Sequence, residues 1–316
     1  MKPFSIIKSE AGRLVGDTSD SVLEKIGEAI NRKYEEIWNL YNWKSITIIN
    51  ESFTLSSGNI EQRLPEGIGT VFCITERSND IVLATSSPYI YSQKYITSIE
   101  TNNMPIAYTA AGWTSLSTDI PADSTISIIG ESTSDTTQTL RLYGTLSSAA
   151  GTEATEKLDL NGDVAVTGTI TYDTTSKLRV YKSALTEGWI RVYDTESSTT
   201  LAYIPARDYT LIYPLINLQA PPDADYTAYV SGKKIFKPLD YDQDCPQFPC
   251  DSALVHYGAS AIHSTRGNTA QLQTETAEGD RIIAALVVDK QINDEGSDDT
   301  YPVINRIDSD VPILGR

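Results

Sequence analysis

The sequence predicts an α+β protein in which a small helical bundle, accompanied by strands, is interrupted by an inserted β-sandwich-like domain. Three observations lead to this prediction. Residues 20–43 repeat apolar side chains at helical spacing. Residues 252–265 and 269–292 do the same near the other end of the chain, which gives one long N-terminal helix and a C-terminal helix pair. Between them, residues 111–218 are rich in Thr, Ser, Tyr and Val and alternate in short runs.

The helix predicted over residues 20–43 has a defined start and a defined apolar face. Ser21 and Glu24 fit a capping box, in which each side chain bonds the backbone N–H of the other residue. Trp38 follows Ile37 directly and is therefore turned by roughly 100° from it around the helix axis. The apolar face comprises Val22, Ile26, Ala29, Ile30, Tyr34, Ile37 and Tyr41.

The segments on either side of this helix are expected to be extended. Residues 1–16 are predicted to be an irregular, arm-like lead-in. Residues 44–55 alternate as a strand, and further strands are expected at 69–74 and 81–83. A Ser-Pro pair then favours a short helix over 89–100, because proline is tolerated at the first helical position.

The middle of the chain has the alternation and turn signals of a β-sandwich. Asn161-Gly162 is a strong hairpin signal, because both central positions of such a turn need a positive φ. The changes in composition divide the chain into three parts. These are a helix-plus-strand part at 1–110, the inserted β-sandwich-like domain at 111–218, and a helix pair with an extended tail at 219–316.

The last of these parts contains a loop, two helices and a tail. Residues 240–249 form an acidic loop bounded by prolines, and Asp251 caps the helix predicted over 252–265. The second helix is predicted over 269–292. From residue 293 onward the sequence is polar and is expected to be extended.

The charge balance excludes some partners. The chain has 25 basic and 42 acidic residues, which gives a formal charge of -17. Tight, sequence-independent binding to nucleic acid is disfavoured, because that binding depends on Lys and Arg neutralising phosphates. No signal peptide follows Met1, and no apolar run is long enough to span a bilayer. We therefore expect a soluble protein made in a cytoplasm, with no membrane partner.

Residue types that carry out catalysis are scarce. The only two histidines, His256 and His263, lie seven apart on a predicted helix. Cys245 and Cys250 precede them, but the spacer is too short for a zinc finger, and ordinary packing is the favoured interpretation. No nucleophile elbow, phosphate loop or dinucleotide fingerprint occurs. We therefore expect no enzyme activity, and we predict no catalytic, cofactor-binding or metal-binding residue.

Two acidic patterns leave a metal-ion alternative open. Asp159, Asn161 and Asp163 imitate the start of a calcium loop, but Ile170 stands where the bidentate glutamate belongs. A hairpin turn explains these residues better. The acids between 240 and 251 would be the ligands of a metal-dependent hydrolase, the least favoured hypothesis, and a solvated loop with a helix cap is the favoured one.

Residues 26–43 have the sequence IGEAINRKYEEIWNLYNW, with a strand-like segment directly after it. This pattern resembles the opening helix of the head–tail adaptor (connector, or neck) proteins of tailed bacteriophages. Residues 53–65 look similar to that family, and so do residues 233–254, in which a KPL segment and an acidic loop lead into a helix. The resemblance covers about 20–110 and 220–293, whereas the inserted domain departs from the family's smaller members.

The resemblance implies a structural virion protein located in the neck between capsid and tail. Such adaptors form a homo-oligomeric ring, usually a dodecamer, that docks on the portal protein and binds downstream tail or neck proteins. The ring connects the DNA-filled capsid to the tail during packaging and ejection. DNA passes through its channel without sequence-specific binding, and an acidic wall permits this because it repels DNA. No cofactor is implied.

Six residues are predicted to bind partners. The C-terminal tail is expected to dock on the portal or on neighbouring subunits through its apolar residues, because such tails commonly order on a partner. Aromatic residues at the end of the first helix are expected to brace the β-rich part or to meet a neighbouring subunit. The six residues are Trp38, Trp43, Ile307, Val311, Ile313 and Leu314.

A phage tail or capsid-surface protein whose β domain recognises a glycan is the main alternative. Aromatic residues such as Trp113 and Trp189 would then contact sugars, although such residues more often form cross-strand packing pairs. The helices at both ends of the chain favour the adaptor, because a receptor-binding protein rarely has a split helical body.

Overall fold

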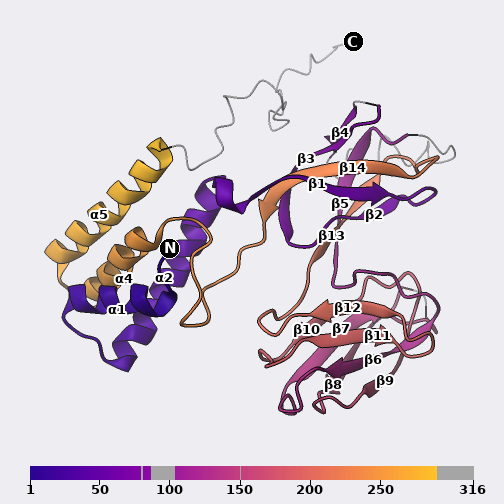
Figure 1. The fold of residues 1–316 in the computed structure, drawn as a ribbon, viewed down its shortest axis with the longest axis horizontal. Helices are drawn as coiled ribbons and strands as arrows, with labels where there is room; N and C mark the ends of the chain where they lie inside the picture. The colour runs from indigo at the N-terminus through magenta and orange to yellow at the C-terminus, as the bar shows by residue number, and fades with distance from the viewer. Residues whose placement is uncertain (80, 87–103, 150, 290–316) are drawn as a thin grey trace, which may run out of the picture. The chain divides into compact units, whose positions relative to one another are not determined.

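A computed structural model describes residues 1–79, 81–86, 104–149 and 151–289 (Figure 1). The chain forms two compact units. The helical unit comprises Met1–Asn50, Gly69–Phe72 and the chain from Ser231 onward, and the β unit comprises Glu51–Ile68 and Cys73–Val230. Every α-helix that the structure describes belongs to the helical unit.

The described residues contain four α-helices: α1 (Phe4–Val15), α2 (Asp20–Leu40), α4 (Asp251–Thr265) and α5 (Thr269–Val288). The helices predicted from the sequence at 20–43, 252–265 and 269–292 correspond to α2, α4 and α5. The helix expected at 89–100 lies outside the described residues. In the part of the chain that the structure describes, no helix is both long and apolar enough to cross a lipid bilayer.

Half of the strands form one curled sheet. Its seven strands have the order β1-β14-β3-β4-β5-β13-β2. β3 and β4 are antiparallel, and so are β5 and β13, whereas β4 and β5 are parallel. The strands are β1 (Thr47–Leu55), β2 (Glu61–Arg63), β3 (Ile68–Glu76), β4 (Ile81–Thr85), β5 (Ala107–Thr114), β13 (Tyr213–Leu218) and β14 (Tyr226–Lys234).

Two smaller sheets share a second hydrophobic core, and we call them the sandwich. Their orders are β10-β7-β8 and β12-β11-β6-β9. Leu140 and Leu142 of β7 are buried and Arg141 between them is exposed, which is the alternation of a sheet with one face on a core. The strands are β6 (Ser124–Gly130), β7 (Thr139–Thr145), β8 (Glu153–Asp159), β9 (Val166–Tyr172), β10 (Arg179–Lys182), β11 (Ile190–Asp194) and β12 (Thr200–Ile204).

The predicted fold class, a helical bundle interrupted by an inserted β domain, is wrong. The protein is mostly β, with fourteen strands in three sheets and four helices among the described residues. Strands expected outside the insertion, such as β1, β3 and β14, share one sheet with β5 and β13. The sequence misled because helical spacing is visible within one segment, whereas a sheet pairs segments far apart in the chain.

The N-terminal lead-in, expected to be irregular, is helix α1. Phe4, Ile7 and Ala11 are buried on one side of it, at spacings of three and four residues. The backbone N–H of Phe4 donates to the carbonyl of Asp244 at 2.7 Å, so the acidic loop satisfies the helix start. Gly16 ends the helix in the left-handed region, with φ of 71°. Four buried positions, one of them Gly12, are too few to stand out as a period in the sequence.

Five aromatic side chains form the centre of the helical core. Trp43 and Phe248 are stacked, with ring centroids 4.5 Å apart and planes 9° apart. Tyr34 stacks on Phe248 at 5.3 Å, and Trp38 meets Phe236 edge-on at 5.5 Å. The cluster joins α2 to the chain that follows β14, because members come from both segments. We call Tyr34, Trp38, Trp43, Phe236 and Phe248 the aromatic cluster.

Hydrogen bonds hold α2 against the end of β14 and against the chain that follows this strand. The Asn31 amide donates to the Leu239 carbonyl at 3.0 Å and accepts from the Leu239 N–H at 2.8 Å. Lys233 Nζ donates to the Trp38 carbonyl and, at 3.1 Å, to the Tyr41 carbonyl. These carbonyls lie at the C-terminal end of α2, where acceptors lack helical partners and a cation is favoured. Burial lowers the pKa of Lys233.

We predict that Phe248→Ala costs the helical unit roughly 3–5 kcal/mol of unfolding free energy, because it empties the fully buried centre of the aromatic cluster. Denaturant unfolding followed by circular dichroism at 222 nm measures this, since the described helices all belong to that unit. As a control in the same unit, Leu40→Ala removes a side chain of α2 that is 61% exposed and should cost less than about 0.5 kcal/mol. Equal costs for the two variants would contradict this account of the core.

Candidate functional site

The partner-binding residues predicted from the sequence fall into two groups. Trp38 and Trp43 are 2% and 0% exposed, and both belong to the aromatic cluster. A direct contact between Trp38 and another subunit would need its side chain to leave this core. The tail residues Ile307, Val311, Ile313 and Leu314 lie outside the described residues. For all six, partner binding stays a prediction.

Helix α5 is attached to α4 along one side. Tyr257 Oη donates to Asp280 at 2.7 Å, and His256 Nδ1 lies 2.7 Å from Glu275. A side-chain carbon added at Gly279 would lie 2.8 Å from the Tyr257 ring, so this contact requires glycine. Burial and the Asp280 carboxylate raise the pKa of Tyr257, which keeps the phenol protonated and able to donate.

The other side of α5 is uncovered in the described chain. Gly279 and Ile283 are the only buried residues among its twenty, and Val288 is 78% exposed. Small side chains dominate this surface, and they would allow a neighbouring helix to approach closely. We call it the α5 outer face, and its exposed members are Ala270, Gln273, Thr274, Ala277, Arg281, Ala284 and Val288.

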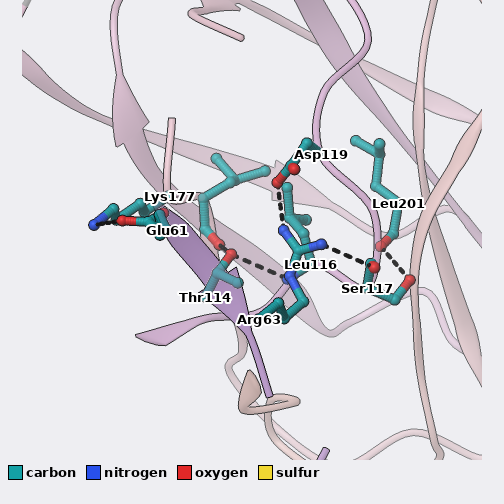
Figure 2. Close-up of polar contacts among 9 residues, drawn as sticks. Glu61, Arg63, Thr114, Leu116, Ser117, Asp119, Lys177 and Leu201 are labelled. Carbon is teal, nitrogen blue, oxygen red and sulfur yellow. Dashed lines mark hydrogen bonds and ion pairs between the residues drawn. The ribbon is translucent and has the colours of Figure 1, made fainter. Parts of the chain in front are cut away.

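A polar junction in the β unit connects the edge strand β2 to the segment that leaves β5 (Figure 2). Arg63 donates to the Ser117 carbonyl at 3.0 Å and forms an ion pair with Asp119. Glu61, two residues earlier on β2, pairs with Lys177. Because these contacts are largely at the surface, they add little to the free energy of unfolding. Their main effect is to orient the segment that leaves β5 relative to β2.

The segment that leaves β5 is also bonded to the sandwich (Figure 2). Thr114 Oγ1 donates to the Leu178 carbonyl at 2.9 Å and accepts from the Leu116 N–H at 3.2 Å. The hydroxyl and the backbone N–H of Ser117 both donate to the Leu201 carbonyl at 2.8 Å. These bonds hold the sandwich to the curled sheet within the β unit, and nothing in their chemistry indicates catalysis.

The group that most resembles a catalytic residue is the buried amine of Lys182. Its Nζ donates to Thr186 Oγ1 at 2.9 Å and to the carbonyls of Pro205 and Ala206 at 2.7 and 3.1 Å. Burial lowers the pKa of Lys182 to about 8, against the opposing effect of nearby aspartates such as Asp208. All three donor positions are used, so the amine serves to hold a loop.

The residues considered for metal binding take part in ordinary structure. Cys250 is buried, which raises the pKa of its thiol, whereas Cys245 is exposed. Asp244 of the acidic loop accepts from the backbone N–H groups of Asp240 and Tyr241 at 3.0 and 2.8 Å. No group of three or more His, Cys, Asp or Glu among the described residues is arranged to hold a metal ion.

The segment that imitates a calcium loop is a tight turn. Asn161 bridges to Val164, and Gly162 has a φ of 63°. The predicted hairpin is wrong, because Asn161 is not among the described non-glycine residues with a positive φ, and β8 and β9 on either side of the turn belong to different sheets. The turn packs closely on its surroundings, because a side-chain carbon at Gly162 would lie 2.9 Å from the Thr133 carbonyl.

No family model matches this chain, and a comparison with curated proteins finds no match. The resemblance of residues 26–43 to adaptor helices therefore remains a prediction from the sequence. What the chain binds has to be argued from its own surfaces.

Sequence reasoning missed the α5 outer face although a signal was present. Ala270, Ala277 and Ala284 recur every seven residues, on the side of the helix opposite its larger apolar residues. Lys182 could also have been found, because alternation along Arg179-Val180-Tyr181-Lys182 places it on the same side as the apolar Val180. In both cases the pattern is short. It predicts a buried or a binding residue only once the element that packs beside it is known.

We predict that wild-type protein gains stability relative to Lys182→Met as the pH rises from 7.5 to 9.5. The folded amine, with its pKa of about 8, loses its proton in this range, whereas the unfolded amine keeps it. The unfolded state then binds more protons, and the gain should be about 1–2 kcal/mol. Urea unfolding of both proteins across this range measures the difference. A flat or falling difference would contradict a depressed pKa at this site.

Proposed function

We propose that this protein is a structural virion protein, a head–tail adaptor of a tailed phage whose copies form a ring on the portal. The ring, usually twelve-fold in that family, would connect the capsid to downstream tail or neck proteins. It would occupy the virion neck after synthesis in the host cytoplasm. The α5 outer face carries this proposal, and the adaptor-like sequence of residues 26–43 supports it.

The α5 outer face supports ring formation through its one-sided packing. Only two of the twenty residues of α5 are buried, whereas a surface helix usually buries an apolar stripe along its whole length. In a ring, the same patch of every subunit meets a different patch of the next one, and the contact closes on itself. Alanines at the centre of such a contact lose almost no side-chain entropy when they are buried.

The position of α5 in the chain supports portal docking by the tail. Val288 ends α5, and residues 293–316 follow shortly after it. Docking of that tail through Ile307, Val311, Ile313 and Leu314 would anchor the ring next to the α5 outer face. A tail that becomes ordered when it docks loses conformational entropy. Burial of its apolar side chains at the partner's surface offsets this loss.

The charge of the chain supports DNA passage without DNA binding. At -17 the protein repels phosphates on average, so a channel lined by it would let DNA slide. Neither this role nor ring formation requires catalysis or a cofactor.

We predict that the double variant Ala277→Glu/Ala284→Glu loses the ring but keeps its fold. Two carboxylates on the α5 outer face would be buried without partners in a ring, whereas both positions are exposed in the single chain. Native mass spectrometry with and without the portal measures assembly, and the unfolding free energy should change by less than about 0.5 kcal/mol.

Two further variants make this test specific. Ser264→Glu/Thr265→Glu places the same two charges on exposed positions of α4 and should leave the ring intact. Deletion of residues 294–316 should abolish portal binding and leave the fold unchanged. Rings of unaltered size from the double variant, or a monomer that never joins the portal in wild type, would overturn the proposal.

A further inference from the structure

The outward surface of sheet β10-β7-β8 gathers aromatic and basic side chains, and we call it the basic-aromatic face. Alternation places Arg179 and Tyr181 of β10 on this side, opposite the buried core. Arg141 and Tyr143 of β7 lie on the same side, as does Lys157 of β8. The strand register puts Arg141 directly between Tyr181 and Lys157.

Three aromatic rings are held in a row on this face. Tyr181 contacts Tyr143 with ring centroids 5.7 Å apart, and it contacts Trp113 of β5 at 5.8 Å. Both pairs are nearly perpendicular, at 86°. The Arg179 guanidinium lies over the Trp113 ring at 5.9 Å. Because neighbouring groups already hold each ring, a ligand that touches them immobilises little that was free.

The charges on this face break a local rule of strand pairing. Arg141 and Lys157 lie directly opposite each other, where like charges are destabilising. Lys157 is 3.1 Å from Asp159 and Arg179 is 3.8 Å from Glu153, but these pairs are exposed and weak. No carboxylate of the described chain pairs with Arg141. Repulsion between two neighbouring cations lowers the stability of the fold, and such violations are expected at functional sites. An anion bound between the two cations would relieve the repulsion.

Nucleic acid is a poor match for this surface. It carries a phosphate on every nucleotide, and its binding depends on neutralising many of them. The basic-aromatic face offers three cations, and alternation along β8 places two carboxylates, Glu153 and Asp159, on the same side, on a chain whose formal charge is -17. A short anion that presents apolar ring faces to the tyrosines needs fewer cations and fits this combination better.

A large protein surface is also a poor match, because the face is small. Three strands lie about 4.8 Å apart, two of seven residues and one of four, and at a rise of about 3.4 Å per residue they span roughly 10 by 20 Å at most. Stable protein interfaces bury about 800 Å² on each partner, several times this area. A few sugar rings are of the right size. Their C–H faces pack on aromatic rings, and a sugar carboxylate can accept two hydrogen bonds from a guanidinium.

We propose that the basic-aromatic face binds an acidic oligosaccharide. Arg141 pairs with a sugar carboxylate, and Tyr143 and Tyr181 contact the sugar rings. Arg179 and Lys157 flank the site and supply the surrounding positive charge. This inference does not depend on the adaptor role, because it concerns the single folded chain.

Isothermal titration of the full-length protein with an oligogalacturonate, which carries one carboxylate on each ring, tests the proposal. We expect saturable binding that weakens as salt screens the charges. Methyl esterification removes those charges and keeps the rings, and it should weaken binding by about tenfold or more. Absence of binding, or equal binding of the esterified sugar, would overturn the proposal.

Matched variants locate the site. Arg141→Gln should weaken oligogalacturonate binding by about tenfold or more, since it removes the bidentate partner of the carboxylate. Arg191→Gln is the control, because Arg191 lies over the Tyr193 ring at 4.7 Å on the other sheet of the sandwich, and it should leave binding unchanged. Unchanged binding by Arg141→Gln would contradict the assignment. So would equal or tighter binding of a single-stranded oligonucleotide or a glutamate-rich peptide of the same charge.

Discussion

The stacking of Trp43 on Phe248 is the interaction on which the helical unit depends. Trp43 follows α2, and Phe248 precedes α4, so one ring pair closes the chain over about two hundred intervening residues. Closing so long a loop costs conformational entropy, which grows slowly with loop length and must be offset by buried contacts. Trp43 also donates its indole N–H to the Ile37 carbonyl at 3.1 Å, which satisfies the polar atom of a fully buried side chain.

This constraint explains how one chain can have two compact units of different character. The core of the helical unit contains the aromatic cluster, and the β unit has a separate core in the sandwich. Each unit also has an exposed surface that its own core does not use, and the two surfaces differ in chemistry. Small residues dominate the α5 outer face, which we propose contacts other copies, whereas the basic-aromatic face combines charge with rings and is proposed to bind a smaller anionic ligand.

Individual residues show how far the sequence could predict the fold and the candidate site. The face of α2 was predictable because Ile26, Ile30 and Tyr34 repeat over several turns. The place of Trp38 was not, because it depends on Phe236, a residue far away in the sequence that packs on it. The curled sheet was missed for the same reason, since pairing between β13 and β2 leaves no local pattern. Arg141, at the centre of the basic-aromatic face, is an exposed charge of a kind found on most strands. Only the aromatic rings beside it indicate that it binds a ligand, and the sequence does not show that these rings lie there.

Hydrogen–deuterium exchange of the protein alone and with the portal measures whether the helical unit makes the contacts of the assembly. The amides of α5 exchange through local opening of its own hydrogen bonds, so a partner seated on its outer face should slow them. With the portal present, we expect increased protection in α5 and in residues 293–316, larger than in any strand of the sandwich. Unchanged protection in α5, or a change confined to the sandwich, would contradict it.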